Sequence, residues 1–133
     1  MLKKLVLPAL TSLALLGCVN NVPVTTTYVS DSNIISMAKS LVADQLRDPE
    51  ATKFKEDVSV YLTSAGDYIA CGTLNGKNAM GGYVGYKPFY ARIRNGRVER
   101  LLLPSPDDKY GFEQKQIVEV CNKAATGSVN VSS

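Results

Sequence analysis

The stretch from Tyr68 to Phe89 constrains the fold more than any other part of the chain. Apolar residues at its two ends flank a middle segment that is rich in glycine and asparagine. These two residue types favour turns, because both tolerate backbone conformations that other residues avoid. The order therefore predicts a strand over residues 68–74, a loop from Asn75 to Gly82 and a second strand over residues 83–94.

The Asn95–Gly96 dipeptide is the strongest local signal for a turn. It predicts a two-residue type I′ hairpin, because asparagine and glycine both accept the positive φ that this turn requires. Such a turn places Ile93 opposite Val98 and Arg92 opposite Glu99. We expect the face with the charged residues of this hairpin to be exposed, namely Arg92, Arg94, Arg97 and Glu99.

Two helices are predicted, one before the strands and one after them. Apolar residues recur at helical spacing over residues 33–47, behind a run of N-cap candidates and before Pro49. A second apolar face repeats over residues 110–125. A half-buried strand over residues 58–63 completes the set. We therefore expect an α+β fold, in which the N- and C-terminal helices pack on one face of a four-stranded antiparallel meander.

A chain of 133 residues has room for one domain, which we place at residues 32–126. Residues 18–31 are polar, rich in threonine and broken by Pro23, so we expect a linker there. Alternatively, the β-branched residues of this segment add an edge strand. We expect residues 127–133 to form a disordered tail.

Residues 1–17 have the features of a lipoprotein signal peptide. A short basic start precedes an apolar run over residues 5–16, and the sequence Leu15-Leu16-Gly17-Cys18 resembles the bacterial lipobox. That resemblance implies that Cys18 is lipidated, with palmitate among its acyl chains, and anchors the chain to a membrane. The alternative is an ordinary signal peptide with an incidental cysteine. Val19 follows Cys18 where an aspartate would imply retention in the inner membrane, so the resemblance favours the outer membrane.

Cysteine number predicts a disulfide. Lipidation of Cys18 leaves Cys71 and Cys121 in an exported, oxidising compartment, where two remaining thiols tend to pair. Closing a loop of about fifty residues would stabilise the fold by roughly 4 kcal/mol. The alternative is two separate buried thiols.

Composition excludes several classes of function. The chain has no histidine, which excludes Ser-His-Asp triads and the usual zinc ligand sets. A disulfide would also remove the thiol nucleophiles. We therefore expect no catalytic residue, no metal site, no cofactor and no enzyme activity. Removal of the signal peptide leaves 13 basic residues against 12 acidic ones, a balance too even to predict nucleic-acid binding.

The loop at residues 75–82 is the best candidate for a binding site. It offers amides and one cation beside tyrosines, which suits a polar ligand with an apolar face. The candidate residues are Asn75, Lys77, Asn78, Gly81, Gly82, Tyr83 and Tyr86. The alternative is that the glycines and asparagines only satisfy turn geometry, while the tyrosines pack over the sheet.

The pattern Cys-Gly-x-x-Asn-x-Lys-Asn-x-x-Gly-Gly-Tyr-x-Gly begins at Cys71 and follows an amphipathic helix and the pair Asp48-Pro49. This combination resembles a family of small bacterial and prophage-associated lipoproteins over roughly residues 33–121. The resemblance implies a single small domain and transfers no activity to this chain.

These features together predict a lipid-anchored, non-enzymatic binding or accessory module of the cell envelope, facing the periplasm. The expected partner is an envelope protein or a glycan, besides the membrane that holds the anchor. The alternative is a periplasmic inhibitor or phage-exclusion lipoprotein that acts on an incoming enzyme or phage component. The sequence sets no expectation for the oligomeric state.

Overall fold

The computed structural model describes residues 21–132, so the expected signal peptide and Cys18 lie outside the described residues. The elements follow in the order β1 (Asn21–Val29), α1 (Ser32–Ala43), β2 (Lys53–Phe54), β3 (Ser59–Thr63), β4 (Tyr68–Asn75), β5 (Lys87–Arg94), β6 (Arg97–Leu102), α2 (Phe112–Ala125) and β7 (Ser128–Ser132). The strands form one antiparallel sheet in the order β6-β5-β4-β3-β1-β7, and the short β2 pairs with β4.

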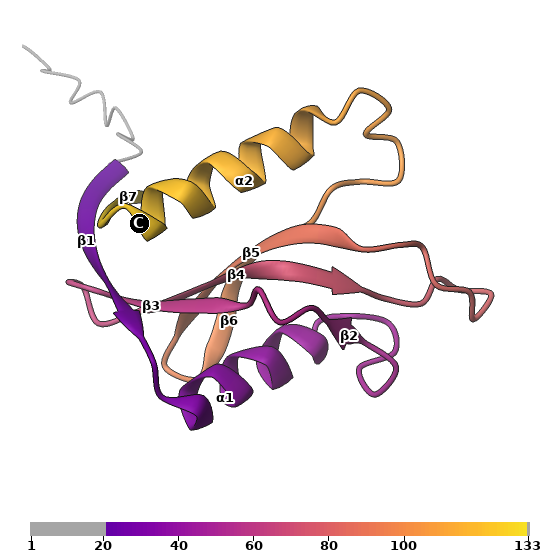
Figure 1. Cartoon of the computed structure of the whole chain (residues 1–133), viewed down its shortest axis with the longest axis horizontal. Helices are drawn as coiled ribbons and strands as arrows, with labels where there is room; N and C mark the ends of the chain where they lie inside the picture. The colour runs from indigo at the N-terminus through magenta and orange to yellow at the C-terminus, as the bar shows by residue number, and fades with distance from the viewer. Residues whose placement is uncertain (1–20, 133) are drawn as a thin grey trace, which may run out of the picture.

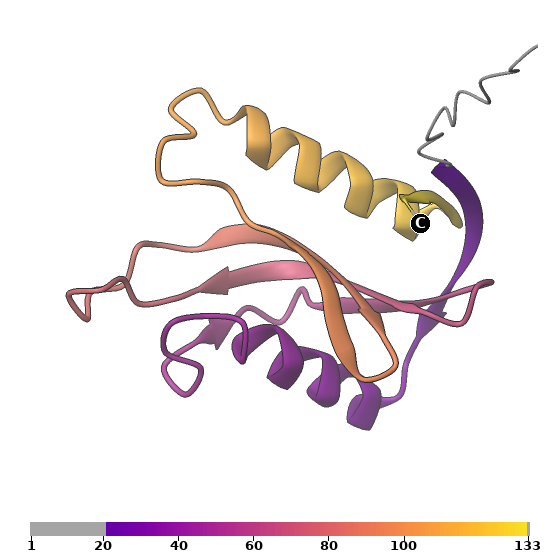
Figure 2. The ribbon, with the colours of Figure 1, turned by 180° about the vertical axis from the view of Figure 1, so that it is seen from behind.

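The two helices lie on opposite faces of the sheet, with α2 above it and α1 below it in Figure 1, and the view from behind in Figure 2 agrees. The expected four-stranded meander with both helices on one face is therefore wrong. Residues 69–71 of β4 and 89–93 of β5 are buried one after another, so side chains on both faces of the sheet need cover. The sheet curls into a half-barrel. Neither helix of residues 21–132 has the length and apolar character needed to cross a bilayer.

One core lies between α1 and the sheet. Ala38 and Val42 of α1 are fully buried and belong to the same cluster as Phe89 of β5. The other buried members are Val58, Val60, Ala70, Leu74, Ala91 and Ile93. The helix ends at Ala43 rather than at the expected residue 47, so the last predicted turn of the helix is a separate turn of the chain.

A second core lies between α2 and the other face of the sheet. Its buried members are Val24, Ile69, Cys71, Tyr90, Ile117, Ala124, Val129 and Val131. Cys71 and Cys121 form a disulfide with a Cα–Cα distance of 5.9 Å, which confirms the expected pairing. The bond fastens α2 to β4 and so fixes the helix over this face.

The hairpin between β5 and β6 has the predicted turn. Asn95 and Gly96 both have positive φ, at 51° and 71°, and the Ile93–Val98 pair forms as expected. Arg92, however, lies opposite Arg100 and not Glu99, because the register shifts between Arg92 and Ile93. Arg92 is also buried, since α2 covers this face of the sheet. The expectation of an exposed charged face is therefore wrong at Arg92.

The two ends of the described chain are paired strands. Residues 21–29 form β1 and residues 128–132 form β7, so the expected linker and the expected disordered tail are wrong for these residues. The alternative of an added strand holds, although β1 lies between β3 and β7 and not at an edge. Val24, Val129 and Val131 are buried on the α2 side, which explains why both segments are held.

Candidate binding site

The loop that the sequence singled out lies at one end of the long axis of the molecule. The chain between β4 and β5 projects beyond the sheet there, while β1 begins at the opposite end (Figures 1 and 2). Met80 in this loop is 94% exposed, and Tyr83, Val84 and Tyr86 are each exposed by between 41% and 52%. The loop is therefore accessible to a ligand or a partner.

The asparagines of the loop hold the loop itself. Asn78 Oδ1 accepts hydrogen bonds from the backbone N–H groups of Met80 at 3.0 Å and Gly82 at 3.1 Å. Asn75 Oδ1 accepts one from the N–H of Gly85 at 3.0 Å. Both side chains therefore satisfy turn geometry, as in the structural alternative considered above.

The two tyrosines are held by the segment around β2. The Tyr83 hydroxyl donates a hydrogen bond to the backbone carbonyl of Ala51 at 2.8 Å, and Lys53 Nζ lies 4.7 Å from the centre of the Tyr83 ring. Lys55 Nζ lies 4.9 Å from the centre of the Tyr86 ring. Each such cation–π contact contributes about 0.5–1 kcal/mol at an exposed site. These contacts fasten the loop to the neighbouring chain.

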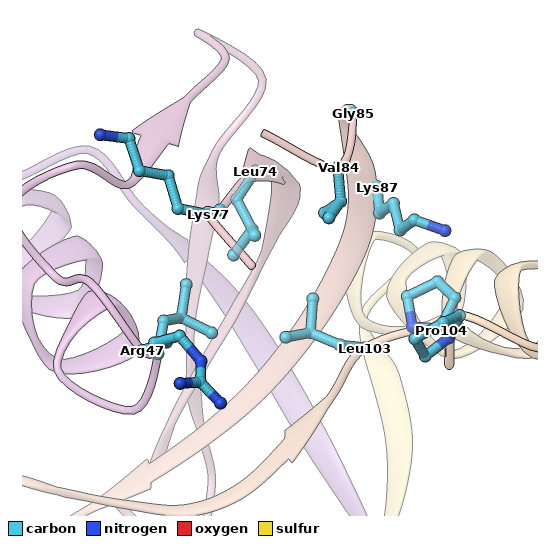
Figure 3. Close-up of a pocket in the computed structure, with 11 residues that line it drawn as sticks. Arg47, Leu74, Lys77, Val84, Gly85, Lys87, Leu103 and Pro104 are labelled. Carbon is cyan, nitrogen blue, oxygen red and sulfur yellow. The ribbon is translucent and has the colours of Figure 1, made fainter. Parts of the chain in front are cut away.

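A pocket of about 340 Å³ lies beside this loop (Figure 3). Its apolar wall combines Leu46 from the turn after α1, Leu74 from β4, Val84 from the loop, and Leu103 and Pro104 from the segment after β6. The side chains of Leu74, Val84 and Leu103 converge on the interior. A concave apolar hollow of this size is typical of a small-molecule site.

Backbone hydrogen bonds preform the wall of this pocket. The N–H of Val84 donates to the carbonyl of Gly76 at 3.2 Å, and Gly85, held by Asn75, has a φ of 96° that favours glycine. Gly76 faces Leu46: a Cβ added at Gly76 would lie 3.8 Å from Leu46 Cδ1. The absence of a side chain at position 76 therefore leaves room in the hollow.

The rim of the pocket is basic. Arg47, Lys77 and Lys87 line it, and among residues 21–132 no aspartate or glutamate does. Across residues 21–132 none of the three forms an ion pair, although Lys77 Nζ lies 5.4 Å from the centre of the Tyr83 ring. Figure 3 shows their charged ends outside the apolar interior. A rim of this composition attracts negatively charged groups.

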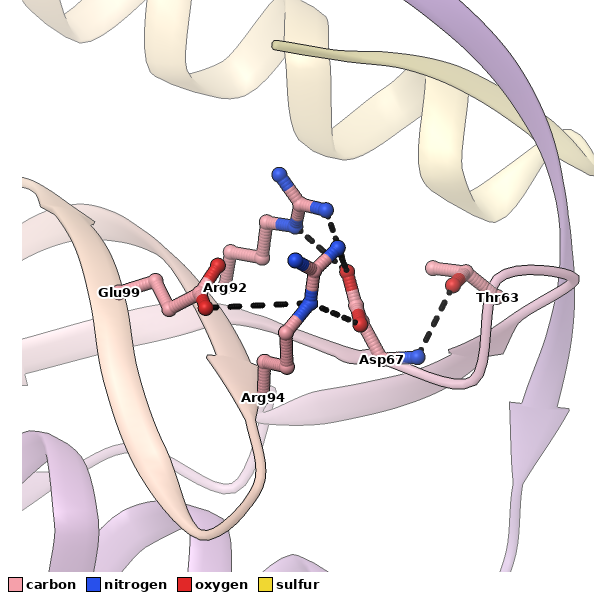
Figure 4. Close-up of polar contacts among 5 residues, drawn as sticks. All are labelled: Thr63, Asp67, Arg92, Arg94 and Glu99. Carbon is pink, nitrogen blue, oxygen red and sulfur yellow. Dashed lines mark hydrogen bonds and ion pairs between the residues drawn. The ribbon is translucent and has the colours of Figure 1, made fainter. Parts of the chain in front are cut away.

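A separate cluster of charges surrounds Asp67, which is 1% exposed (Figure 4). Its carboxylate accepts hydrogen bonds from Arg92 Nε at 2.6 Å and from Arg94 Nε at 2.9 Å. Arg94 Nε also lies 3.8 Å from Glu99, and the Asp67 N–H donates to Thr63 Oγ1 at 3.2 Å. Burial raises the pKa of Asp67, but the hydrogen bonds and charges of the two arginines lower it by more, so this pKa lies below the ordinary 3.8. The carboxylate is therefore fully engaged within the fold.

Other parts of the described chain offer less for binding. In residues 21–132 no three Cys, Asp or Glu side chains come together in a way that could hold a metal ion. Two smaller hollows, of about 240 and 190 Å³, lie between α2 and the sheet, one beside the Cys71–Cys121 disulfide and one beside Tyr90 and Arg92.

The structure brings one of the seven candidate residues, Lys77, to the wall of the main pocket. The other six lie in or next to the loop and do not line the pocket. Sequence reasoning missed Arg47, Val84 and Leu103, which come from three distant segments. A signal was present at Val84, an apolar β-branched residue between the loop glycines, and at the apolar Leu103, just before a proline-rich turn.

Comparisons of the chain with protein-family models, with curated proteins and with solved structures give no match.

Proposed function

We propose that the protein is a lipid-anchored, non-enzymatic binding module of the cell envelope. Its ligand enters the pocket beside the connection between β4 and β5, residues 76–86, which we call the 76–86 loop. The observation that carries this proposal is the apolar pocket with a basic rim at an accessible end of the molecule. A pocket whose walls are held by backbone hydrogen bonds loses little free energy to ordering when a ligand binds.

The position of Cys18 supports an orientation for this module. Cys18 stands three residues before the start of β1 at Asn21, and three extended residues span at most about 11 Å. A lipid on Cys18 would therefore hold the start of β1 close to the membrane surface. The pocket, at the other end of the long axis, would face away from that membrane, into the periplasm for an outer-membrane anchor.

The environment of the reactive groups supports a non-enzymatic role. Asp67 is paired with two arginines, and Cys71 and Cys121 are consumed by the disulfide. The Asp57 carboxylate accepts hydrogen bonds from the N–H and the hydroxyl of Thr73. Each of these groups is thus engaged within the fold, and the hollow of about 240 Å³ that Asp57 and the two cysteines line contains no free thiol.

Replacement of Cys18 by serine tests the anchor. The variant should no longer incorporate radiolabelled palmitate and should move from the membrane fraction to the soluble fraction, because the thiol is the acylation site. Palmitate labelling and membrane partition that persist in Cys18→Ser would contradict the proposed anchor.

Photo-crosslinking in living cells tests the binding role. A diazirine-bearing lysine analogue at position 87, on the pocket rim, should give an adduct that intact-mass spectrometry detects on the purified protein. The same analogue at Lys115, an exposed position on α2 away from the pocket, is the matched control. Absence of an adduct at position 87, or the same adduct at both positions, would contradict a binding role for the pocket.

A further inference from the structure

The interior of the pocket favours an aliphatic group. Leu46, Leu74, Val84, Leu103 and Pro104 provide its wall, and Val84 remains 52% exposed. An aliphatic chain that entered the hollow would remove this apolar surface from water, which is the main driving force for association of apolar groups. The described part of the chain places no aromatic residue in the lining on which a sugar or a base would stack.

The rim adds a requirement for negative charge. Arg47, Lys77 and Lys87 surround the apolar interior without an acidic residue among the lining, and none of them forms an ion pair in the described part of the chain. Guanidinium and ammonium groups bind carboxylate and phosphate through charge-assisted hydrogen bonds. An aliphatic chain in the hollow would place a terminal anionic head at this rim.

β4 cannot accept an added peptide strand beside the pocket. Leu74 and Asn75, at the end of β4 beside the pocket, pair with Phe54 and Lys53 of β2, and Leu74 also pairs with Lys87 of β5. Both edges of β4 are therefore occupied at this point. Strand addition, the common way in which a sheet binds an extended peptide, needs a free edge.

We propose that the pocket binds a small anionic amphiphile, with one carboxylate or phosphate head and a single aliphatic chain. The chain lies in the hollow beside Leu74 and Leu103, and the head lies at the basic rim that Arg47, Lys77 and Lys87 provide. This ligand class rests on the proposed function, because it names what the binding module takes up.

Direct titration tests the ligand class. The mature chain, residues 18–133 with Cys18→Ser, lacks both the acyl chains and the apolar run at residues 5–16, so it can be handled without detergent. It is titrated below the micelle concentration with decanoate, decyl phosphate or decyltrimethylammonium, and binding is followed by calorimetry. Decanoate and decyl phosphate should bind, and decyltrimethylammonium should bind at least tenfold more weakly. Equal binding of all three probes, or no binding of either anionic probe, would overturn the proposal.

Two variants assign the binding to this pocket. Gly76→Leu fills the hollow next to Leu46 and should abolish decanoate binding without lowering the melting temperature. Arg47→Glu combined with Lys87→Glu should weaken decanoate binding at least tenfold, while Lys115→Glu, with a matched charge reversal on α2, should leave it unchanged. Decanoate binding that survives both pocket variants would overturn the assignment, and the charge variant keeps the test decisive if Gly76→Leu does not fold.

A flotation assay separates the two sources of such a ligand. Binding of the Cys18→Ser protein to phosphatidylglycerol vesicles that is lost in Gly76→Leu would assign the head and chain to a bilayer lipid. Decanoate binding without vesicle binding would assign them to a free amphiphile. A protein adduct at position 87 in cells, together with no decanoate binding, would overturn this inference and leave the proposed binding function standing.

Discussion

Asp67 places a buried carboxylate between two arginines, one of which is itself buried. Replacement by asparagine would remove the carboxylate charge that pairs with Arg92, whose side chain is 7% exposed. Removal of one partner of a buried pair costs about 3–5 kcal/mol. We expect Asp67→Asn to lower the free energy of unfolding by that amount in urea titrations.

Arg94→Gln is the matched control for this change. The Arg94 side chain is 42% exposed, and solvent screens its charge, so its loss should lower the free energy of unfolding much less than the loss of Asp67 does. A loss for Asp67→Asn no larger than that for Arg94→Gln would contradict a stabilising role for the buried pair.

The lowered pKa of Asp67 predicts how stability depends on pH. A carboxyl whose folded pKa lies below its unfolded value stabilises the fold above the unfolded pKa, about 3.9 for aspartate, and this contribution disappears as pH falls through the folded pKa. The wild-type protein should therefore lose stability steeply below about pH 4. Asp67→Asn should flatten this acid limb in urea titrations between neutral and acid pH. An identical slope for the two proteins would contradict the assignment.

The buried pair shows what sequence reasoning misses at the scale of single residues. An aspartate in a turn and an arginine in a strand are both typical of exposed positions. Asp67 and Arg92 are buried because each neutralises the other, and this pairing joins the β3–β4 turn to β5. No local pattern around either residue reports the distant partner.

Gly72 in β4 lies at a point where the backbone of Val58 comes close to this strand. A Cβ at this position would lie 2.8 Å from Val58 Cγ2 and 2.9 Å from Val58 Cα, so backbone would have to shift. We expect Gly72→Ala to destabilise the fold by about 2 kcal/mol, as for other overpacked positions. Gly76→Ala is the control, since its Cβ would make only an ordinary contact with Leu46. Equal melting temperatures for the two variants would show that Gly72 is not needed for packing.

The disulfide between β4 and α2 holds the second core together, so its removal should lower the stability of the fold. Replacement of Cys71 and Cys121 by alanine should lower the free energy of unfolding by about 4 kcal/mol. The reason is that the bond closes a loop of 50 residues in the unfolded chain. Urea unfolding of the double variant measures this cost. Non-reducing peptide mapping of the wild-type protein should recover the linked pair. Free thiols at both positions in exported protein would contradict the bond.

The individual helices and strands could be predicted from local signals in the sequence, but the way in which they pack could not. Spacing and turn residues predicted α1, α2 and the Asn95–Gly96 hairpin, because each signal lies within a few residues. The consecutive burial of residues 69–71 in β4 and 89–93 in β5 indicates cover on both faces of the sheet, and the apolar run from Ile69 to Cys71 was the available sign of it. The predicted meander placed both helices on one face of the sheet and so left the other face without cover.

The shape of the whole molecule depends on contacts between its two ends. β1 and β7 pair from Asn21 with Ser132 to Thr25 with Ser128, which adds two strands to the sheet. Both segments are short, polar and rich in threonine, serine or asparagine, as is typical of linkers and tails. Val24, Val129 and Val131 are buried on the α2 side, so the strand character of both segments depends on a surface that only the folded domain provides. The pocket likewise gathers residues from four segments and could not be read from one of them.

The most direct test of the account measures which end of the molecule faces the membrane. The full-length lipidated protein carries a fluorophore on a single added cysteine, either Val22→Cys in β1 or Met80→Cys in the 76–86 loop, and sits in vesicles with nitroxide-labelled lipids. We expect strong quenching at position 22 and little at position 80, because the anchor holds β1 at the membrane surface and the pocket faces away from that membrane. Equal quenching at the two positions, or stronger quenching at position 80, would contradict it.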